Sequence, residues 1–129
     1  MLLDTTFILD LLRNNPEAVQ KASSLKNSTE PLLTTTVTVF EIWQGSCDLK
    51  DSRKKQKIET LLSAIGLLPL DVEAAKKAGI IHNECYKNGT PIDPEESMIA
   101  GIAKTHNQSI LTRNVKHFSK VDGLKIDTY

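Results

Sequence analysis

Met1-Leu2-Leu3-Asp4-Thr5-Thr6-Phe7-Ile8 opens the chain, and this stretch passes from a short apolar run directly into a helical pattern. The run from Met1 to Leu3 fits one brief strand, and Phe7, Ile8, Leu11 and Leu12 recur at the spacing of one helix face. The same alternation continues along the chain. The other predicted strands are Pro31–Thr35, Leu67–Leu70, Ser109–Thr112 and Leu124–Ile126. Short strands separated by helices predict an α/β fold, a three-layer sandwich whose central parallel sheet is covered by helices on both faces.

The size and composition of the chain fit one globular domain. With 129 residues, 40% of them hydrophobic, it can bury one ordinary core, so we expect one domain over residues 1–129. Its 16 basic residues balance 16 acidic ones, so any contact with nucleic acid needs a local basic patch. No run approaches the ~18 apolar residues of a membrane span and no export signal is present, which indicates a cytoplasmic protein. Cys47 and Cys85 are expected to be small buried residues in a reducing compartment.

Acidic residues follow the predicted strands, where ligands bind in open parallel sheets. Asp4 comes directly after the first strand, and Glu41 lies on the first turns of the helix after the second strand. Glu96 is in the first turn of the helix before the strand that ends at Thr112, and Asn114 follows that strand. We expect these side chains to converge without a neutralising lysine. Clustered carboxylates repel one another unless a cation lies between them, and these oxygen ligands suit Mg²⁺ or Mn²⁺.

Each of these residues also has a structural explanation. Thr38-x-x-Glu41 has the pattern of a helix capping box, and Asp93-Pro94-Glu95-Glu96 is a strong helix start. Asp4 is able to cap the first helix, and Asn114 suits a turn with positive φ. The cation site is favoured because all the acids are expected at the same edge of the sheet.

The same residues carry a resemblance to a known family, the PIN-domain ribonucleases, and among them the small VapC-type toxins of toxin–antitoxin pairs. The resemblance covers nearly the whole chain, and each of its four motifs stands in the family's order. The motifs are Leu2-Leu3-Asp4-Thr5-Thr6-Phe7-Ile8, Thr35 to Gly45 with Glu41, Glu96-Ser97-Met98-Ile99-Ala100, and Leu111-Thr112-Arg113-Asn114-Val115-Lys116-His117-Phe118. It implies a PIN-like sandwich.

The resemblance also implies roles for particular residues. Asp4, Glu41 and Glu96 would be the acidic metal ligands, Asn114 would occupy the fourth catalytic position, and Thr112 would support the site by hydrogen bonding. Where the family usually has Asp, this chain has Glu96, whose extra methylene moves the carboxylate outward. Asp93 therefore stays open as an alternative ligand.

Basic and apolar residues beside these motifs are candidates for contacts with other molecules. Arg113 and Lys116, with His117 and Lys120, flank Asn114 and could form the basic rim that an RNA backbone needs. The run Arg53-Lys54-Lys55-Gln56-Lys57 is better explained as a solvated helix face. Trp43, Leu61, Leu62 and Ile65 complete the core or form an interface, and the sequence leaves both possibilities open.

We therefore expect a Mg²⁺- or Mn²⁺-dependent endoribonuclease of the PIN class, in which a metal-activated water hydrolyses RNA phosphodiester bonds. The resemblance implies a cognate antitoxin and a homodimer as partners. One alternative is a weakened PIN-fold protein that acts as a binding partner without cutting RNA. A receiver-like phosphoryl-transfer domain fits less well, because the late strand ends in Thr112-Arg113 instead of a lysine.

Overall fold

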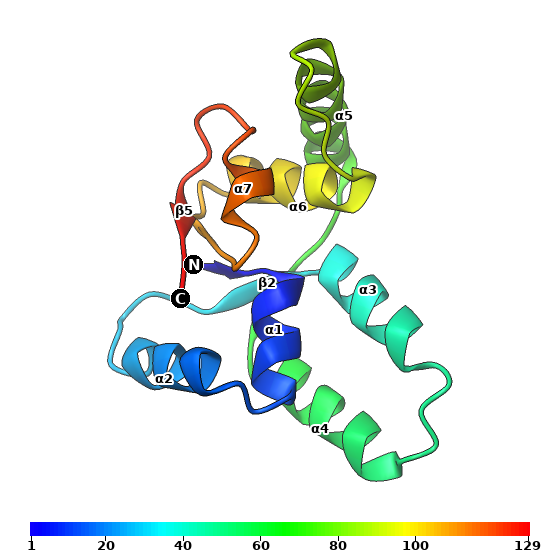
Figure 1. Cartoon of the computed structure of the whole chain (residues 1–129), viewed down its shortest axis with the longest axis vertical. Coiled ribbons are helices and arrows are strands. Elements are labelled where there is room, and N and C mark those ends of the chain that lie inside the picture. The colour runs from blue at the N-terminus through cyan, green and yellow to red at the C-terminus, as the bar shows by residue number, and fades with distance from the viewer.

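The computed structural model describes residues 1–129 and contains five strands and seven helices (Figure 1). The strands are β1 (Leu2–Leu3), β2 (Leu33–Thr35), β3 (Gly66–Leu68), β4 (Ile110–Leu111) and β5 (Ile126–Asp127). The helices are α1 (Thr5–Leu12), α2 (Pro16–Leu25), α3 (Thr36–Ser46), α4 (Ser52–Ser63), α5 (Val72–Lys87), α6 (Pro94–Thr105) and α7 (Val115–Phe118). No helix is long and apolar enough to cross a membrane.

The five strands form one parallel sheet in the order β3-β2-β1-β4-β5. The first strand is therefore central, with Leu2 opposite Leu33 of β2 on one side and Ile110 of β4 on the other. The expected strands are all present, but their bounds differ by one or two residues because pairing with the neighbour sets their ends. For example, β3 begins at Gly66 because this residue pairs with Leu33 of β2.

Two hydrophobic cores lie on the two faces of the sheet, which confirms the three-layer architecture. Leu2 and Leu3 point to opposite faces, as successive residues of a strand must. Leu2 belongs to the core beneath α5, α6 and α7, whereas Leu3 belongs to the core formed with α1, α2 and α4. Figure 1 shows these two groups of helices on opposite sides of the sheet.

Several helices begin at side chains that accept hydrogen bonds from the first turn. The Asn15 side chain accepts from the backbone N–H groups of Glu17 and Ala18, and Asp71 accepts from that of Ala74 at 2.8 Å. Such caps satisfy backbone donors that a helix itself leaves unpaired. The predicted cap at Asp71 is confirmed.

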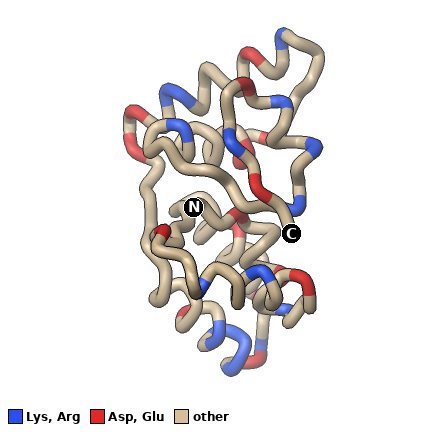
Figure 2. Tube along the Cα trace, turned by 90° about the vertical axis from the view of Figure 1, so that its left-hand side faces the viewer, with Lys and Arg blue, Asp and Glu red and all other residues tan.

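Charge is dispersed over the molecule. Figure 2 shows Lys and Arg interspersed with Asp and Glu along the length of the trace. This distribution agrees with the zero net charge of the sequence.

Candidate functional site

Asp4 lies at the carboxyl end of the central strand, directly before α1. It is only 3% exposed, and its Oδ2 accepts hydrogen bonds from Thr112 Oγ1 at 2.7 Å and Thr6 Oγ1 at 2.9 Å. Its side chain makes no capping hydrogen bond to α1, so the capping explanation is wrong. Burial raises the pKa of Asp4 above its ordinary value, against the hydroxyl hydrogen bonds, which lower it. Asp4 is thus a buried carboxyl held by hydroxyl groups and not by a basic side chain.

Glu41 reaches the same edge of the sheet from α3. Its Oε1 accepts a hydrogen bond from Thr5 Oγ1 at 2.8 Å, and that hydroxyl also lies 3.1 Å from Thr38 Oγ1. Burial raises the pKa of Glu41, the Thr5 hydrogen bond lowers it, and repulsion from Asp4, Glu95 and Glu96 raises it further. The acids therefore lie close enough to influence one another, as the sequence predicts.

The expected capping box at Thr38 is not formed. The helix begins at Thr36, and the preceding Thr35 accepts a hydrogen bond from the Thr38 N–H at 2.9 Å. Thr38 is therefore a fully buried residue inside α3, where its hydroxyl joins Thr35 to Thr5.

Glu96, in the first turn of α6, faces the segment that follows β4. Its Oε2 accepts a hydrogen bond from the backbone N–H of Asp93 at 3.0 Å, which confirms that Glu96 stabilises the helix start. Its Oε1 lies 2.6 Å from Asn114 Nδ2 and 2.7 Å from His117 Nδ1. The Glu96 side chain is 14% exposed, whereas Asp93 is exposed at the helix end. Of the two open candidates, Glu96 is the acid that contacts the Asn114 segment.

Thr112 and Asn114 join this segment to Asp4. Thr112 is fully buried, and its hydroxyl donates to Asp4 Oδ2 and accepts from the backbone N–H of Asn114 at 2.9 Å. The expected hydrogen-bonding support by Thr112 is therefore present. Asn114 has φ −87°, so the expectation of a positive φ is wrong. Among residues other than glycine, positive φ angles occur instead at Asn14 and Asn107.

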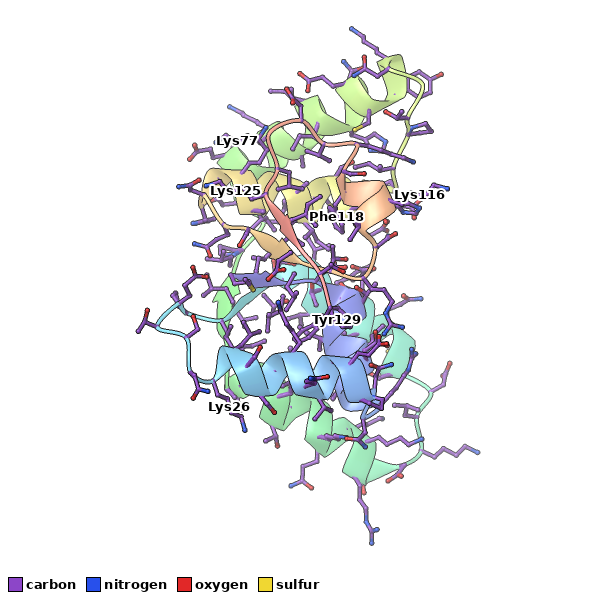
Figure 3. The ribbon with its side chains drawn as sticks, turned by 60° about the vertical axis from the view of Figure 1, so that its left-hand side comes forward. Lys26, Lys77, Lys116, Phe118, Lys125 and Tyr129 are labelled. Atoms are coloured by element: carbon purple, nitrogen blue, oxygen red, sulfur yellow. The ribbon has the colours of Figure 1, made fainter.

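Two of the basic residues expected at the rim, Arg113 and Lys116, differ in their surroundings. Arg113 Nη2 lies 3.2 Å from Asp10 Oδ2 and 3.4 Å from Glu17 Oε2, and the guanidinium lies over the Tyr129 ring at 5.3 Å. Lys116 is exposed, forms no ion pair, and extends outward from α7 (Figure 3). Of these two residues, Lys116 is the one that can meet an approaching phosphate without breaking an ion pair. Lys120 also forms no ion pair, and its Nζ donates to the Pro91 carbonyl at 3.3 Å.

The donor atoms at this edge suit a divalent cation. No three His, Cys, Asp or Glu side chains are gathered closely enough to hold a metal ion as they stand. The available donors are nevertheless carboxylate oxygens, and no Lys or Arg pairs with Asp4, Glu41 or Glu96. Mg²⁺ and Mn²⁺ use a few such carboxylates and complete their coordination with water and substrate phosphate. The repulsion that raises the pKa of Glu41 is the kind that a cation relieves.

Sequence reasoning missed two contributors to this arrangement. The first is Thr5, whose hydroxyl donates to Glu41. The second is His117, and its i to i+3 spacing from Asn114 was the available signal. His117 was placed in the basic rim, yet its ring contacts an acid of the site.

The residues expected at interfaces or in the core divide between the two. Trp43 is 44% exposed and lines a surface groove with Val39, Leu62 and Leu67, so it does not complete the core. Leu62 is largely buried, whereas Leu61 and Ile65 are half-buried. Cys85 is buried as expected, but Cys47 is exposed, since it follows the end of α3.

Known proteins match this chain over nearly its full length. The tRNA(fMet)-specific endonuclease VapC of Shigella flexneri is 30% identical over 129 residues, covering 99% of this chain and 96% of that protein. The protein of the same name from Salmonella typhimurium is 28% identical over 129 residues with the same coverage. The crystal structure of DNA-bound VapBC from Salmonella typhimurium matches with a TM-score of 0.85 and 28% identity, covering 98% of this chain and 96% of that chain. The PIN domain family model matches residues 1–124. The chain belongs to the PIN domain family.

Proposed function

We propose that this chain is a metal-dependent endoribonuclease of the VapC toxin type, which hydrolyses RNA phosphodiester bonds. The observation that carries the proposal is the placement of Asp4, Glu41 and Glu96, from three separate elements, at one edge of the sheet without a lysine or arginine partner. The VapC endonucleases similar to this chain support the reaction class.

Asp4, Glu41 and Glu96 would hold Mg²⁺ or Mn²⁺. The cation would supply an activated water and would stabilise the charge that develops on the phosphodiester. Ser97, beside Glu96, is buried, and its hydroxyl lies 2.8 Å from His82 Nδ1, so we propose hydrolysis without a covalent intermediate on the protein.

The chain's own residues orient these acids. The Thr112 and Thr6 hydroxyls donate to Asp4, and the Thr5 hydroxyl donates to Glu41, which favours the charged carboxylates that a cation requires. Asn114 directs its amide toward Glu96 at 2.6 Å. Lys116 would contact an RNA phosphate from outside, whereas Arg113 would first have to leave Asp10 and Glu17.

We further propose a cognate antitoxin and a second copy of the chain as partners. The VapBC complex similar to this chain supports the first. A surface groove between α1, α2 and α4, lined by Leu11, Leu12, Ala22 and Leu61, could receive an apolar helix face of the antitoxin. Trp43 lines a different groove and is our candidate for contact with the second copy.

The Asp4→Asn substitution tests the proposed activity. We expect it to abolish RNA cleavage in the presence of Mg²⁺ or Mn²⁺ without unfolding the protein, because neutralising a buried carboxyl removes a desolvation cost. Cleavage of labelled RNA and a melting curve are the two measurements, and EDTA should stop the wild-type reaction.

Asp48→Asn is the matched control, since Asp48 is exposed and makes no side-chain hydrogen bond or ion pair. Cleavage by Asp4→Asn at the wild-type rate would show that the catalytic site is placed wrongly. Wild-type protein that binds a divalent cation but cuts no RNA would instead favour the binding-partner alternative.

A further inference from the structure

Three polar side-chain atoms meet at one point between α6 and α7. Glu96 Oε1 lies 2.6 Å from Asn114 Nδ2 and 2.7 Å from His117 Nδ1, and the last two atoms are 3.0 Å apart. Each atom is therefore within hydrogen-bond distance of the other two. The sequence brings them together because Asn114 and His117 are three residues apart and flank the first turn of α7.

No arrangement of protons satisfies all three contacts while the carboxylate is ionised. The Glu96 oxygen can only accept. If His117 Nδ1 carries a proton, it donates to Glu96 but faces the Asn114 amide as donor against donor. If Nδ1 is bare, it accepts from Asn114 but faces Glu96 as acceptor against acceptor. Rotating the Asn114 amide places two oxygens against each other. In every case one of the three contacts is not a hydrogen bond.

A cation at this point satisfies all three groups together. Glu96 Oε1, a bare His117 Nδ1 and, after rotation of the amide, Asn114 Oδ1 all present lone pairs. Two oxygens and one imidazole nitrogen suit first-row transition-metal ions better than Mg²⁺, which prefers oxygen donors and retained water.

We propose that His117 is a nitrogen ligand beside Glu96 and Asn114, and that it makes the site selective for transition-metal ions such as Mn²⁺ over Mg²⁺. The inference rests on the proposed function, since it concerns the divalent cation of the same site. It extends the acidic set of Asp4, Glu41 and Glu96 by a residue of a different chemical type.

The exposure of Glu96 and His117 favours this assignment. The His117 side chain is 41% exposed and that of Glu96 is 14% exposed, so a hydrated cation can reach them from solvent. No lysine or arginine pairs with Glu96.

His117 is also the only one of the three histidines whose ring contacts a carboxylate. The His82 ring instead meets Ser97 Oγ at 2.8 Å, and His106 is exposed at the end of α6. His106 therefore provides a matched control for His117.

Calorimetric titration of the full chain with Mn²⁺ and with Mg²⁺ tests the proposal, on wild type, His117→Gln and His106→Gln. We expect wild type to bind Mn²⁺ at least ~10-fold more tightly than Mg²⁺, an effect of the size found when groups that support a metal ligand are removed. His117→Gln should lose most of this preference through weaker Mn²⁺ binding, with Mg²⁺ binding changed less than about twofold. His106→Gln should behave as wild type. An unchanged ratio of Mn²⁺ to Mg²⁺ affinity in His117→Gln would overturn the assignment.

A second measurement does not depend on a variant. In ¹⁵N NMR of the histidine rings, one equivalent of diamagnetic Zn²⁺ should shift Nδ1 of His117 and leave His106 in place. A His117 resonance that stays unmoved would refute ligation by the ring.

The experiments distinguish a failure of the proposed catalytic site from a failure of the His117 assignment. Loss of cleavage in Asp4→Asn with an unchanged metal preference in His117→Gln would remove only the His117 ligand. Full cleavage by Asp4→Asn together with loss of the preference in His117→Gln would remove the proposed catalytic site and leave the metal ligand standing.

Discussion

Replacing Thr112 with valine removes a hydroxyl from beneath the central acid while keeping the shape of the side chain. The hydroxyl is fully buried and donates to Asp4 Oδ2 at 2.7 Å. A hydrogen bond to a charged group contributes about 1.5–3 kcal/mol to stability, and Asp4 is too buried for water to replace it. We therefore expect Thr112→Val to lower the free energy of unfolding at neutral pH by about 2–3 kcal/mol.

Thr34→Val is the matched control, because Thr34 is equally buried and donates at 2.8 Å to an uncharged acceptor, the backbone carbonyl of Leu3. Its loss should cost about 1 kcal/mol, the usual contribution of a neutral hydrogen bond. Urea denaturation of both variants beside wild type gives the two values.

The cost of Thr112→Val should also depend on pH. Burial raises the pKa of Asp4 in the folded protein above 3.8, so the folded state binds the proton more readily than the unfolded chain does. The contribution of Asp4 to stability consequently falls as the pH rises from 3.8 through the folded pKa. Thr112→Val removes an interaction that lowers this pKa, so its destabilisation should be larger at neutral pH than near pH 3.8.

Comparing the destabilisation at the two pH values separates the hydrogen bond to a charged Asp4 from the other contact of Thr112. Thr112 also accepts a hydrogen bond from the Asn114 N–H, and that loss is the same at both pH values. Thr34→Val should show no such difference. An equal destabilisation of Thr112→Val at neutral pH and near pH 3.8 would mean that the hydroxyl does not stabilise a charged Asp4.

Two further predictions concern the third acid and the packing of α5 on α6. Glu96→Asp should retain or raise cleavage activity, and Glu96→Gln should lose most of it; an RNA cleavage assay checks both, and a more damaging Asp93→Asn would assign the ligand to Asp93. Gly101→Ala should destabilise the fold by about 1–3 kcal/mol in thermal denaturation, because its Cβ would lie 2.7 Å from the Ala74 carbonyl oxygen. Gly79→Ala, on the exposed face of α5 with nothing within 4 Å of its Cβ, should stabilise by up to about 1 kcal/mol, and destabilisation there would contradict the packing argument.

The architecture was predictable because its signals are local and periodic. Alternation along each strand places Leu2 and Leu3 in different cores, and helical spacing places Phe7 and Ile8 in the second one. The position of Asp4 follows from the same pattern, since it ends the first apolar run.

The details of the site were less predictable because they depend on contacts between distant segments. Arg113 pairs with Asp10 and Glu17, about a hundred residues away, and no local pattern shows that its charge is already engaged. The capping box expected at Thr38 failed because α3 begins at Thr36, immediately after β2. The cap is Thr35, three residues earlier, and a run of four threonines and one valine from Thr34 to Thr38 does not show which threonine ends the strand.

The central place of β1 explains how such short strands build a site. Asp4 has β4 on one side, where Thr112 donates to its carboxyl, and β2 and α3 on the other, where Thr5 holds Glu41. Since side chains alternate along a strand, a one-residue shift of β4 would bring Leu111 or Arg113 to the place of the Thr112 hydroxyl. The backbone bond from the Asp4 N–H to the Leu111 carbonyl, at 3.0 Å, holds the register that prevents this. The hydrogen bonds that align the sheet therefore also align the acid that we propose binds the cation.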